Sequence, residues 1–250
     1  MTQVSHPFAS PEGLPAPTRT LLLGGDDPEH KRRELLDYFC QTFDLYDSLF
    51  DCLADERAWF NKAIPLRHPL IFYYGHTAAF FVNKLLAGNL IDRRLDPRIE
   101  AMVAIGVDEM SWDDLDETHY DWPAVAELRA YRGRVRALVC DFIERMPIAL
   151  PIDWQSPAWV ILMGIEHERI HLETSSVLIR QLPLAWVRSQ PQWPVCPEAR
   201  HDLAAVPVNT LLPVAGGQVR LGKQDATYGW DNEYGERHIE LAPFQASRML

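Results

Sequence analysis

Four long segments of this 250-residue chain carry apolar residues at steps of three and four positions, which is the spacing of one face of an α-helix. Helix-start residues, such as Asp27-Pro28 and Ser156-Pro157, precede the first and the last of these segments. The predicted helices cover about residues 28–61, 69–86, 121–146 and 156–181. Because helices joined by loops of mixed length pack around a shared core, the fold class predicted is mainly α, with a four-helix bundle.

The character of the sequence changes after residue 182. Prolines recur and helix-forming residues become few, which predicts a linker. Beyond it, residues 210–221 and 239–250 have sequence patterns typical of strands and turns. About 40 residues are too few for a domain of that kind, so we expect the chain to stop inside a second domain. The predicted organisation is a flexible leader over 1–20, a helical bundle over 21–182, a linker over 183–209 and an incomplete domain over 210–250.

The overall charge of the chain narrows its expected partners. Its 35 acidic and 24 basic side chains leave a formal net charge of −11, without the excess of Lys and Arg that binds nucleic acid or an anionic membrane. Small molecules or proteins are therefore the expected partners.

The sequence also indicates where the protein is located. The N-terminus lacks the pattern of a secretion signal, and no apolar run approaches the roughly 20 residues of a membrane span. The four cysteines show no CxxC pairing. These features predict a cytoplasmic protein.

Two histidines in the last predicted helix are spaced to share a metal ion. His167 and His171 are four residues apart, which places both imidazoles on one helix face with Cβ atoms about 5–6 Å apart. Glu168 completes an HExxH motif, which in zinc metalloproteases supplies the general base. Glu168 nevertheless lies about 100° around the helix from His167, so we expect it to point away from the metal. The histidine pair is therefore the candidate metal site.

A third ligand has to come from another helix, and His76 is the best candidate. It lies in the most apolar of the predicted helices, beside small residues such as Gly75 that leave room for its ring. Among the other histidines, His68 is interpreted as a cap or surface residue. His119 is a weaker rival, in an acidic segment interpreted as a solvated loop. The predicted metal ligands are His76, His167 and His171.

The type of ligand does not by itself select the metal. Three neutral imidazoles leave about three free positions on an octahedral ion, which suits a non-haem Fe(II) centre that binds substrate and O2 side by side. Zinc with three histidines and a water is chemically as legitimate. A metzincin would need Gly at position 174 and His at position 177, where this chain has Thr174 and Val177. A zinc hydrolase is therefore disfavoured, and no catalytic residue is assigned.

Longer stretches around these histidines resemble a known family. Residues 73–81 (YYGHTAAFF) and the His167-x-x-x-His171-x-Glu173 pattern resemble the three-histidine iron site of the sulfoxide synthases of ergothioneine and ovothiol biosynthesis. In these enzymes a DinB-like four-helix bundle is followed by an α+β formylglycine-generating-enzyme-like domain, which has a C-type-lectin-like fold. The start of that second domain is similar to residues 213–222 and 229–233, and residues 67–76 and 104–114 are most similar to the ovothiol branch, the 5-histidylcysteine sulfoxide synthases.

This resemblance implies an activity and a set of substrates. It implies that His76, His167 and His171 hold Fe(2+), and that cysteine, histidine and O2 are the substrates of an oxidoreductase that couples the cysteine thiol to the imidazole ring and oxidises sulfur to the sulfoxide. Glu173 belongs to the family motif, but helix geometry directs it away from the metal. We interpret it as an anchor between helices or, alternatively, as a solvated surface carboxylate. The remaining substrate-binding groups are expected beyond Leu250, so this fragment alone is expected to lack catalysis.

Two interpretations from other classes stay open. A DinB-like zinc- or nickel-dependent thiol transferase has the same bundle and three histidines but no second domain, and the strand-like region after Pro213 counts against it. A bundle that binds a metal or a partner without catalysis would hold the histidines with no open coordination position. The sequence does not separate this last interpretation from an enzyme.

Overall fold

The protein has a helical unit and a smaller unit that contains its strands. The computed structural model describes residues 19–104, 120–193 and 208–249. The two compact units are Met1–Trp193 and Pro194–Leu250. His119 and most of the acidic segment around it lie outside the described residues. No helix within these three ranges is both long and apolar enough to span a membrane.

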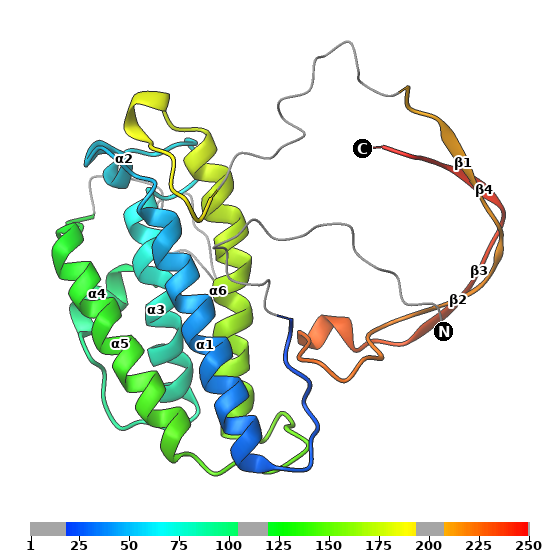
Figure 1. The fold of residues 1–250 in the computed structure, drawn as a ribbon, viewed down its shortest axis with the longest axis horizontal. Coiled ribbons are helices and arrows are strands. Elements are labelled where there is room, and N and C mark those ends of the chain that lie inside the picture. Colours follow the sequence, from blue (N-terminus) through cyan, green and yellow to red (C-terminus); the bar gives the residue numbers. More distant parts are fainter. Residues whose placement is uncertain (1–18, 105–119, 194–207, 250) are drawn as a thin grey trace. The chain divides into compact units, whose positions relative to one another are not determined.

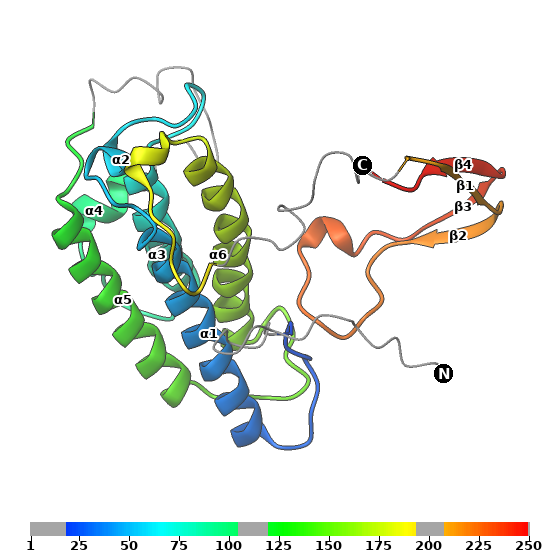
Figure 2. The ribbon, with the colours of Figure 1, turned by 45° about the horizontal axis from the view of Figure 1, so that its top comes forward.

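Four long helices form the body of the helical unit. α1 packs against α5 and α6, and α3 also packs against α5 and α6, so that the four helices lie side by side around one core (Figures 1 and 2). Short helices connect them and follow the last of them. The helices are α1 (Pro28–Phe50), α2 (Arg57–Phe60), α3 (Leu70–Ala87), α4 (Pro97–Met102), α5 (Val125–Arg145), α6 (Pro157–Arg180) and the 3-10 helix η3 (Leu184–Trp186).

Two of the predicted helices agree closely with the structure. α3 ends at Ala87 with Gly88 as its C-cap. α6 begins after Ser156, whose hydroxyl accepts a hydrogen bond from the backbone N–H of Ala158. The helix predicted over 121–146 is also present, but α5 begins only at Val125 after Ala124 as N-cap.

The first helix is shorter than the prediction of a helix that reaches residue 61. α1 ends at Phe50, and the chain resumes a single helical turn in α2. The intervening backbone pairs with a distant segment: Ala54 N–H donates to the Trp186 carbonyl, and Arg188 N–H donates to the Cys52 carbonyl. These hydrogen bonds satisfy backbone groups that a continuing helix would have used, so a tertiary contact ends the helix.

The close approach of α3 and α6 depends on Gly164. A Cβ atom built at Gly164 would lie 2.2 Å from Cε1 of Phe81 on α3, a distance that real Cβ atoms do not reach. The Phe81 ring is buried and packs edge-on against Phe39 of α1, so it has no free space to move into. The absence of a side chain at Gly164 therefore lets the two helices that carry the histidines lie close together.

Replacing Gly164 by Ala is expected to destabilise the protein by about 1–3 kcal/mol, because overpacking of a filled core costs more than the helix propensity gained. Gly133 on α5 is a matched control, since a Cβ built there meets nothing within 4 Å. Gly133→Ala is expected to stabilise by about 0.5–1 kcal/mol. Urea unfolding of both variants measures the difference, and equal free energies of unfolding for the two would contradict this account of the α3–α6 contact.

Two of the cysteines face each other between helices. Sγ of Cys40 on α1 lies 3.8 Å from Sγ of Cys140 on α5, well beyond the roughly 2.05 Å of a disulfide bond. Both are free thiols, as is Cys52, while Cys196 lies outside the described residues. Burial, followed by the neighbouring Cys140, raises the pKa of Cys40 to about 11, so this thiol is protonated at neutral pH.

The second unit contains two antiparallel strand pairs. β1 (Leu211–Val214) pairs with β4 (Phe244–Ser247), and β2 (Gly217–Leu221) pairs with β3 (Arg237–Leu241). A short 3-10 helix, η6 (Asp231–Glu233), lies between β2 and β3. The prediction of strands within residues 210–221 and 239–250 is confirmed. Most side chains of the four strands are exposed, so these pairs bury little apolar surface of their own.

Candidate metal centre

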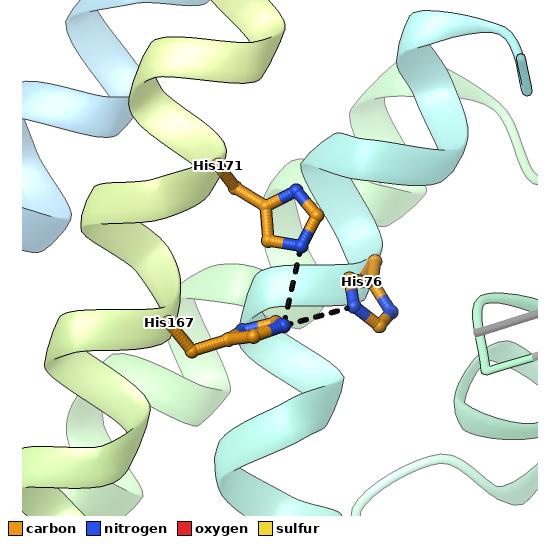
Figure 3. Close-up of side chains that lie close together, drawn as sticks. All are labelled: His76, His167 and His171. Atoms are coloured by element: carbon orange, nitrogen blue, oxygen red, sulfur yellow. Dashed lines mark hydrogen bonds between the residues drawn. The ribbon is translucent and has the colours of Figure 1, made fainter. Parts of the chain in front are cut away.

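The structure brings the three predicted histidines together. His76 lies in the second turn of α3, whereas His167 and His171 lie on successive turns of α6. Their rings point toward one another across the space between the two helices (Figure 3). Nε2 of His167 lies 3.2 Å from Nε2 of His76 and 3.2 Å from Nε2 of His171. One nitrogen of each ring lies within 4.8 Å of the others, a spacing that can hold a metal ion.

A backbone carbonyl orients His76. Its Nδ1 lies 2.8 Å from the carbonyl oxygen of Val103, the residue that caps α4. A carbonyl can only accept, so the proton sits on Nδ1 and Nε2 presents its lone pair to the other two histidines. Gly75 makes this approach possible, because a Cβ there would lie 2.8 Å from Val103 Cγ1. His76 is only 4% exposed, so its orientation is set by the protein rather than by solvent.

Aromatic rings of α3 cover the three imidazoles. Phe80 stacks on His167 with ring centroids 3.8 Å apart, and Phe72 stacks on His76 at 5.2 Å. Tyr73 lies against His171 at 5.8 Å. Apolar surface on these sides limits the access of water to the rings and restricts their rotation. Each histidine is therefore held in place by a neighbour from α3.

The surroundings keep the two α6 histidines neutral. Burial, followed by the neighbouring His76, lowers the pKa of His171 to about 3. Burial, followed by His171 and His76, lowers the pKa of His167 far below its ordinary value. Both rings are therefore deprotonated at neutral pH and offer lone pairs without first releasing a proton.

These depressed pKa values predict acid sensitivity of the metal-free protein. In the unfolded chain a histidine titrates near pH ~6.5, whereas folded His171 takes up its proton only near about 3. Between these values the unfolded state binds more protons, so the free energy of unfolding falls as the pH falls, by up to about 1.4 kcal/mol per pH unit for one such histidine.

Urea unfolding at pH 7 and pH 5 measures this loss. His171→Asn, which cannot titrate in this range, is expected to lose less stability between the two pH values than the parent protein. Equal losses in the parent and the variant would contradict the assignment of the effect to His171.

A bound metal ion explains the close approach of the three Nε2 atoms better than hydrogen bonds between the rings do. His76 Nε2 is an acceptor, and His167 Nε2 faces both His76 Nε2 and His171 Nε2, yet one ring nitrogen carries at most one proton. At most one of the two 3.2 Å contacts can therefore be a hydrogen bond, whereas a cation between the nitrogens would account for both. Three neutral imidazoles suit Fe, Zn, Ni or Cu, so these residues would hold such an ion through their Nε2 atoms.

Glu168 points away from this site, as helix geometry predicted. It is fully buried and its carboxylate accepts hydrogen bonds from Nη2 of Arg132 at 3.0 Å and from the hydroxyl of Thr77 at 3.1 Å. Arg132 also donates to Thr77 Oγ1 and to the carbonyl of Tyr74. Burial opposes the charge of Arg132, but the carboxylates of Glu168 and Asp47 outweigh it and raise the pKa of the guanidinium.

The sequence interpretation did not include Arg132, although a signal for it was present. It stands beside Tyr131 in a helix whose apolar stripe includes Leu128 and Val135, and an arginine next to such a stripe is a candidate for a buried ion pair. In the structure Arg132 is only 1% exposed. We name the group Arg132, Glu168 and Thr77 the buried ion-pair network. Because Thr77 follows His76 and Glu168 follows His167, this network ties α3 to α6 next to the metal ligands.

The structure also places His68 and Glu173. The interpretation of His68 as a cap or surface residue is wrong, because this side chain is buried and stacks on Phe72 with ring centroids 4.2 Å apart. Glu173 is exposed and its carboxylate accepts no hydrogen bond from another residue within the described ranges, which favours a solvent-facing carboxylate over an anchor between helices.

Comparison with known proteins identifies the class that this fold and site define. The model of the DinB superfamily matches residues 38–175, more than half of the chain, and the chain therefore belongs to that superfamily. The match runs from within α1 to within α6 and includes all three histidines.

The chain is also similar to ergothioneine biosynthesis protein 1 of Neurospora crassa, with 24% identity over 215 residues that cover 74% of this chain and 22% of the relative. The chain thus spans about a fifth of the length of that protein.

Proposed function

We propose that this chain carries the metal centre of a non-haem Fe(II)- and O2-dependent sulfoxide synthase that joins the thiol of cysteine to the imidazole ring of histidine, as in ovothiol biosynthesis. The observation that carries the proposal is the convergence of three Nε2 atoms, one from α3 and two from α6. Similarity to a protein of ergothioneine biosynthesis supports it from an independent direction. The strand-containing unit would then be the start of the formylglycine-generating-enzyme-like domain.

In the proposed enzyme the histidines and the aromatic residues around them would have different roles. His76, His167 and His171 would hold the ion, and Phe72 and Phe80 would exclude water from two of the three rings. Fe(II), when bound, supplies one-electron reactivity with O2 and a charge that favours the thiolate form of cysteine. In the overall reaction one oxygen atom of O2 ends on sulfur, and the other leaves as water with the thiol hydrogen and the ring hydrogen.

The alternatives are separated by specific features of the site. A hydrolase of the HExxH type needs its glutamate as a general base, but Glu168 is fully buried and paired with Arg132. A closed, purely structural metal site is disfavoured because a pocket opens beside His171. A zinc- or nickel-dependent thiol transferase is the remaining candidate, since the helical unit alone contains the three imidazoles that it needs. In the proposed function the partners are cysteine, histidine and O2, in the cytoplasm.

Oxygen uptake by the metal-loaded protein tests the proposal. The full-length protein, reconstituted with Fe(II) without oxygen, is expected to take up O2 when cysteine and histidine are supplied together and to form a cysteine–histidine sulfoxide detectable by mass spectrometry. Protein loaded with Zn(II) is the control and is expected to take up none. Absence of uptake with both substrates, together with tight retention of zinc, would overturn the oxygenase assignment and favour the thiol transferase.

A further inference from the structure

A small pocket opens beside His171, whereas Phe72 and Phe80 stack on the other two histidines. It has a volume of about 220 Å³ and lies between the second half of α6 and the segment that precedes α3. Pockets for drug-sized ligands measure about 300–1,000 Å³, so this one fits a smaller molecule of the size of an amino acid. His171 belongs both to the wall of this pocket and to the histidine cluster.

The pocket combines one cation and one anion. Arg67 lines it from the segment before α3, and Glu173 lines it from α6. Both side chains are exposed, and neither forms an ion pair within the parts of the chain that the structure describes. Two charges of opposite sign in one pocket are available to a ligand that carries both signs.

The other residues that line the pocket are of two kinds, polar and apolar. Tyr73 and Thr174 add hydroxyl groups, whereas Val177 and Leu178 supply apolar surface. Burial raises the pKa of Tyr73 and lowers that of His171, and Arg67 lowers the pKa of both, through its charge at each group and also through a side-chain hydrogen bond at Tyr73. A hydrogen bond from the backbone N–H of Arg67 to the carbonyl of Ile64 closes a turn beneath it. The hydrogen bond to Tyr73 holds the Arg67 side chain at the wall of the pocket that His171 also lines.

We propose that this pocket binds the charged end of an α-amino acid, with Arg67 on its carboxylate and Glu173 on its ammonium group, so that the side chain of the amino acid extends toward His171. The inference rests on the proposed function in one respect, namely that the amino acid has a thiol side chain. It assigns to two exposed residues a role in substrate choice that the three histidines by themselves do not provide.

Thiols that lack one end of the amino acid test this arrangement. The full-length protein, with Co(II) in place of the native ion, is titrated with cysteine, cysteamine and 3-mercaptopropionate, and the visible absorption of cobalt reports binding. Cysteamine lacks the carboxylate and 3-mercaptopropionate lacks the ammonium group. Cysteine is expected to bind about tenfold more tightly than either, since each lost charge-assisted contact is worth about a factor of ten.

Single substitutions test whether Arg67 binds the carboxylate of cysteine and whether Glu173 binds its ammonium group. Arg67→Gln is expected to remove the difference between cysteine and cysteamine, and Glu173→Gln the difference between cysteine and 3-mercaptopropionate. Arg180→Gln and Glu144→Gln are matched controls, because these exposed residues lie on α6 and α5 outside the pocket, and both differences are expected to persist in them. Persistence of both differences in Arg67→Gln and Glu173→Gln would overturn the proposal.

Failure of the proposed function gives a different result. If the Fe(II)-loaded protein takes up no O2 while the cobalt protein still distinguishes the thiols through Arg67 and Glu173, the oxygenase assignment is overturned and the pocket stands. If O2 uptake occurs and neither substitution changes the KM for cysteine, the proposed role of the pocket is overturned and the oxygenase assignment stands.

Discussion

Replacing His76 by Ala is expected to weaken the binding of Fe(II) by more than about 100-fold. Loss of a group that only supports a metal ligand already costs about 10–100-fold, and His76 is the single ligand contributed by α3. The two histidines of α6 would remain on one helix face, but they would hold the ion from one side only. Metal content after reconstitution, measured by mass spectrometry, reports the loss.

The design of this experiment separates loss of a ligand from loss of the fold. His30→Ala is the matched control, because His30 lies exposed at the start of α1 and contributes nothing to the cluster. Circular dichroism is expected to be the same for both variants. An unchanged metal content in His76→Ala would remove His76 from the site, and with it the three-histidine centre on which the proposed function depends.

Breaking the buried ion-pair network is expected to have the largest effect on stability. Glu168→Leu leaves the guanidinium of Arg132 buried without one of its two carboxylate partners, and loss of one partner from a buried pair costs about 3–5 kcal/mol. Arg132→Leu is expected to cost a similar amount, because it leaves the Glu168 carboxylate unpaired in the core. The double variant is expected to lose less than the sum, since neither charge then remains.

The conservative variant Glu168→Gln distinguishes a structural role from a catalytic one. A glutamine can still accept hydrogen bonds from Arg132 and Thr77, so most of the stability and the metal content are expected to persist. With a structural role turnover is also expected to persist, whereas replacing a general base would abolish turnover and leave stability unchanged. If Glu168→Gln abolished turnover while the free energy of unfolding and the metal content stayed at the parent level, Glu168 would regain the role that the HExxH motif gives it in metalloproteases.

Much of the helical unit was predictable because its helices are marked locally. Ser156-Pro157 marks the start of α6 and Gly88 the end of α3, and each helix carries its own apolar periodicity. The spacing of His167 and His171 is equally local, since four residues on a helix make one face whatever surrounds it. The direction of Glu168, away from the pair, follows from the same geometry.

The errors at the end of α1 and at His68, and the omission of Arg132, concern interactions between residues that are distant in the sequence. The end of α1 at Phe50 depends on hydrogen bonds to residues 186–188, and buried His68 contacts the distant rings of Tyr120 and Trp122. The pairing of Arg132 with Glu168 likewise joins α5 to α6. A pattern found along one helix does not contain the identity of the helix that packs against it.

The sequence by itself therefore determined which long segments are helical, where most of them stop, and that two imidazoles share a face of the last long helix. Only the tertiary structure decided that His76 faces that pair with Nε2 forward, that Glu168 pairs with Arg132, and that Arg67 and Glu173 line one pocket beside His171. The physical reason is that helix formation is governed by neighbours within a few residues. The position of a side chain in a site depends instead on the close packing of helices that are far apart along the chain.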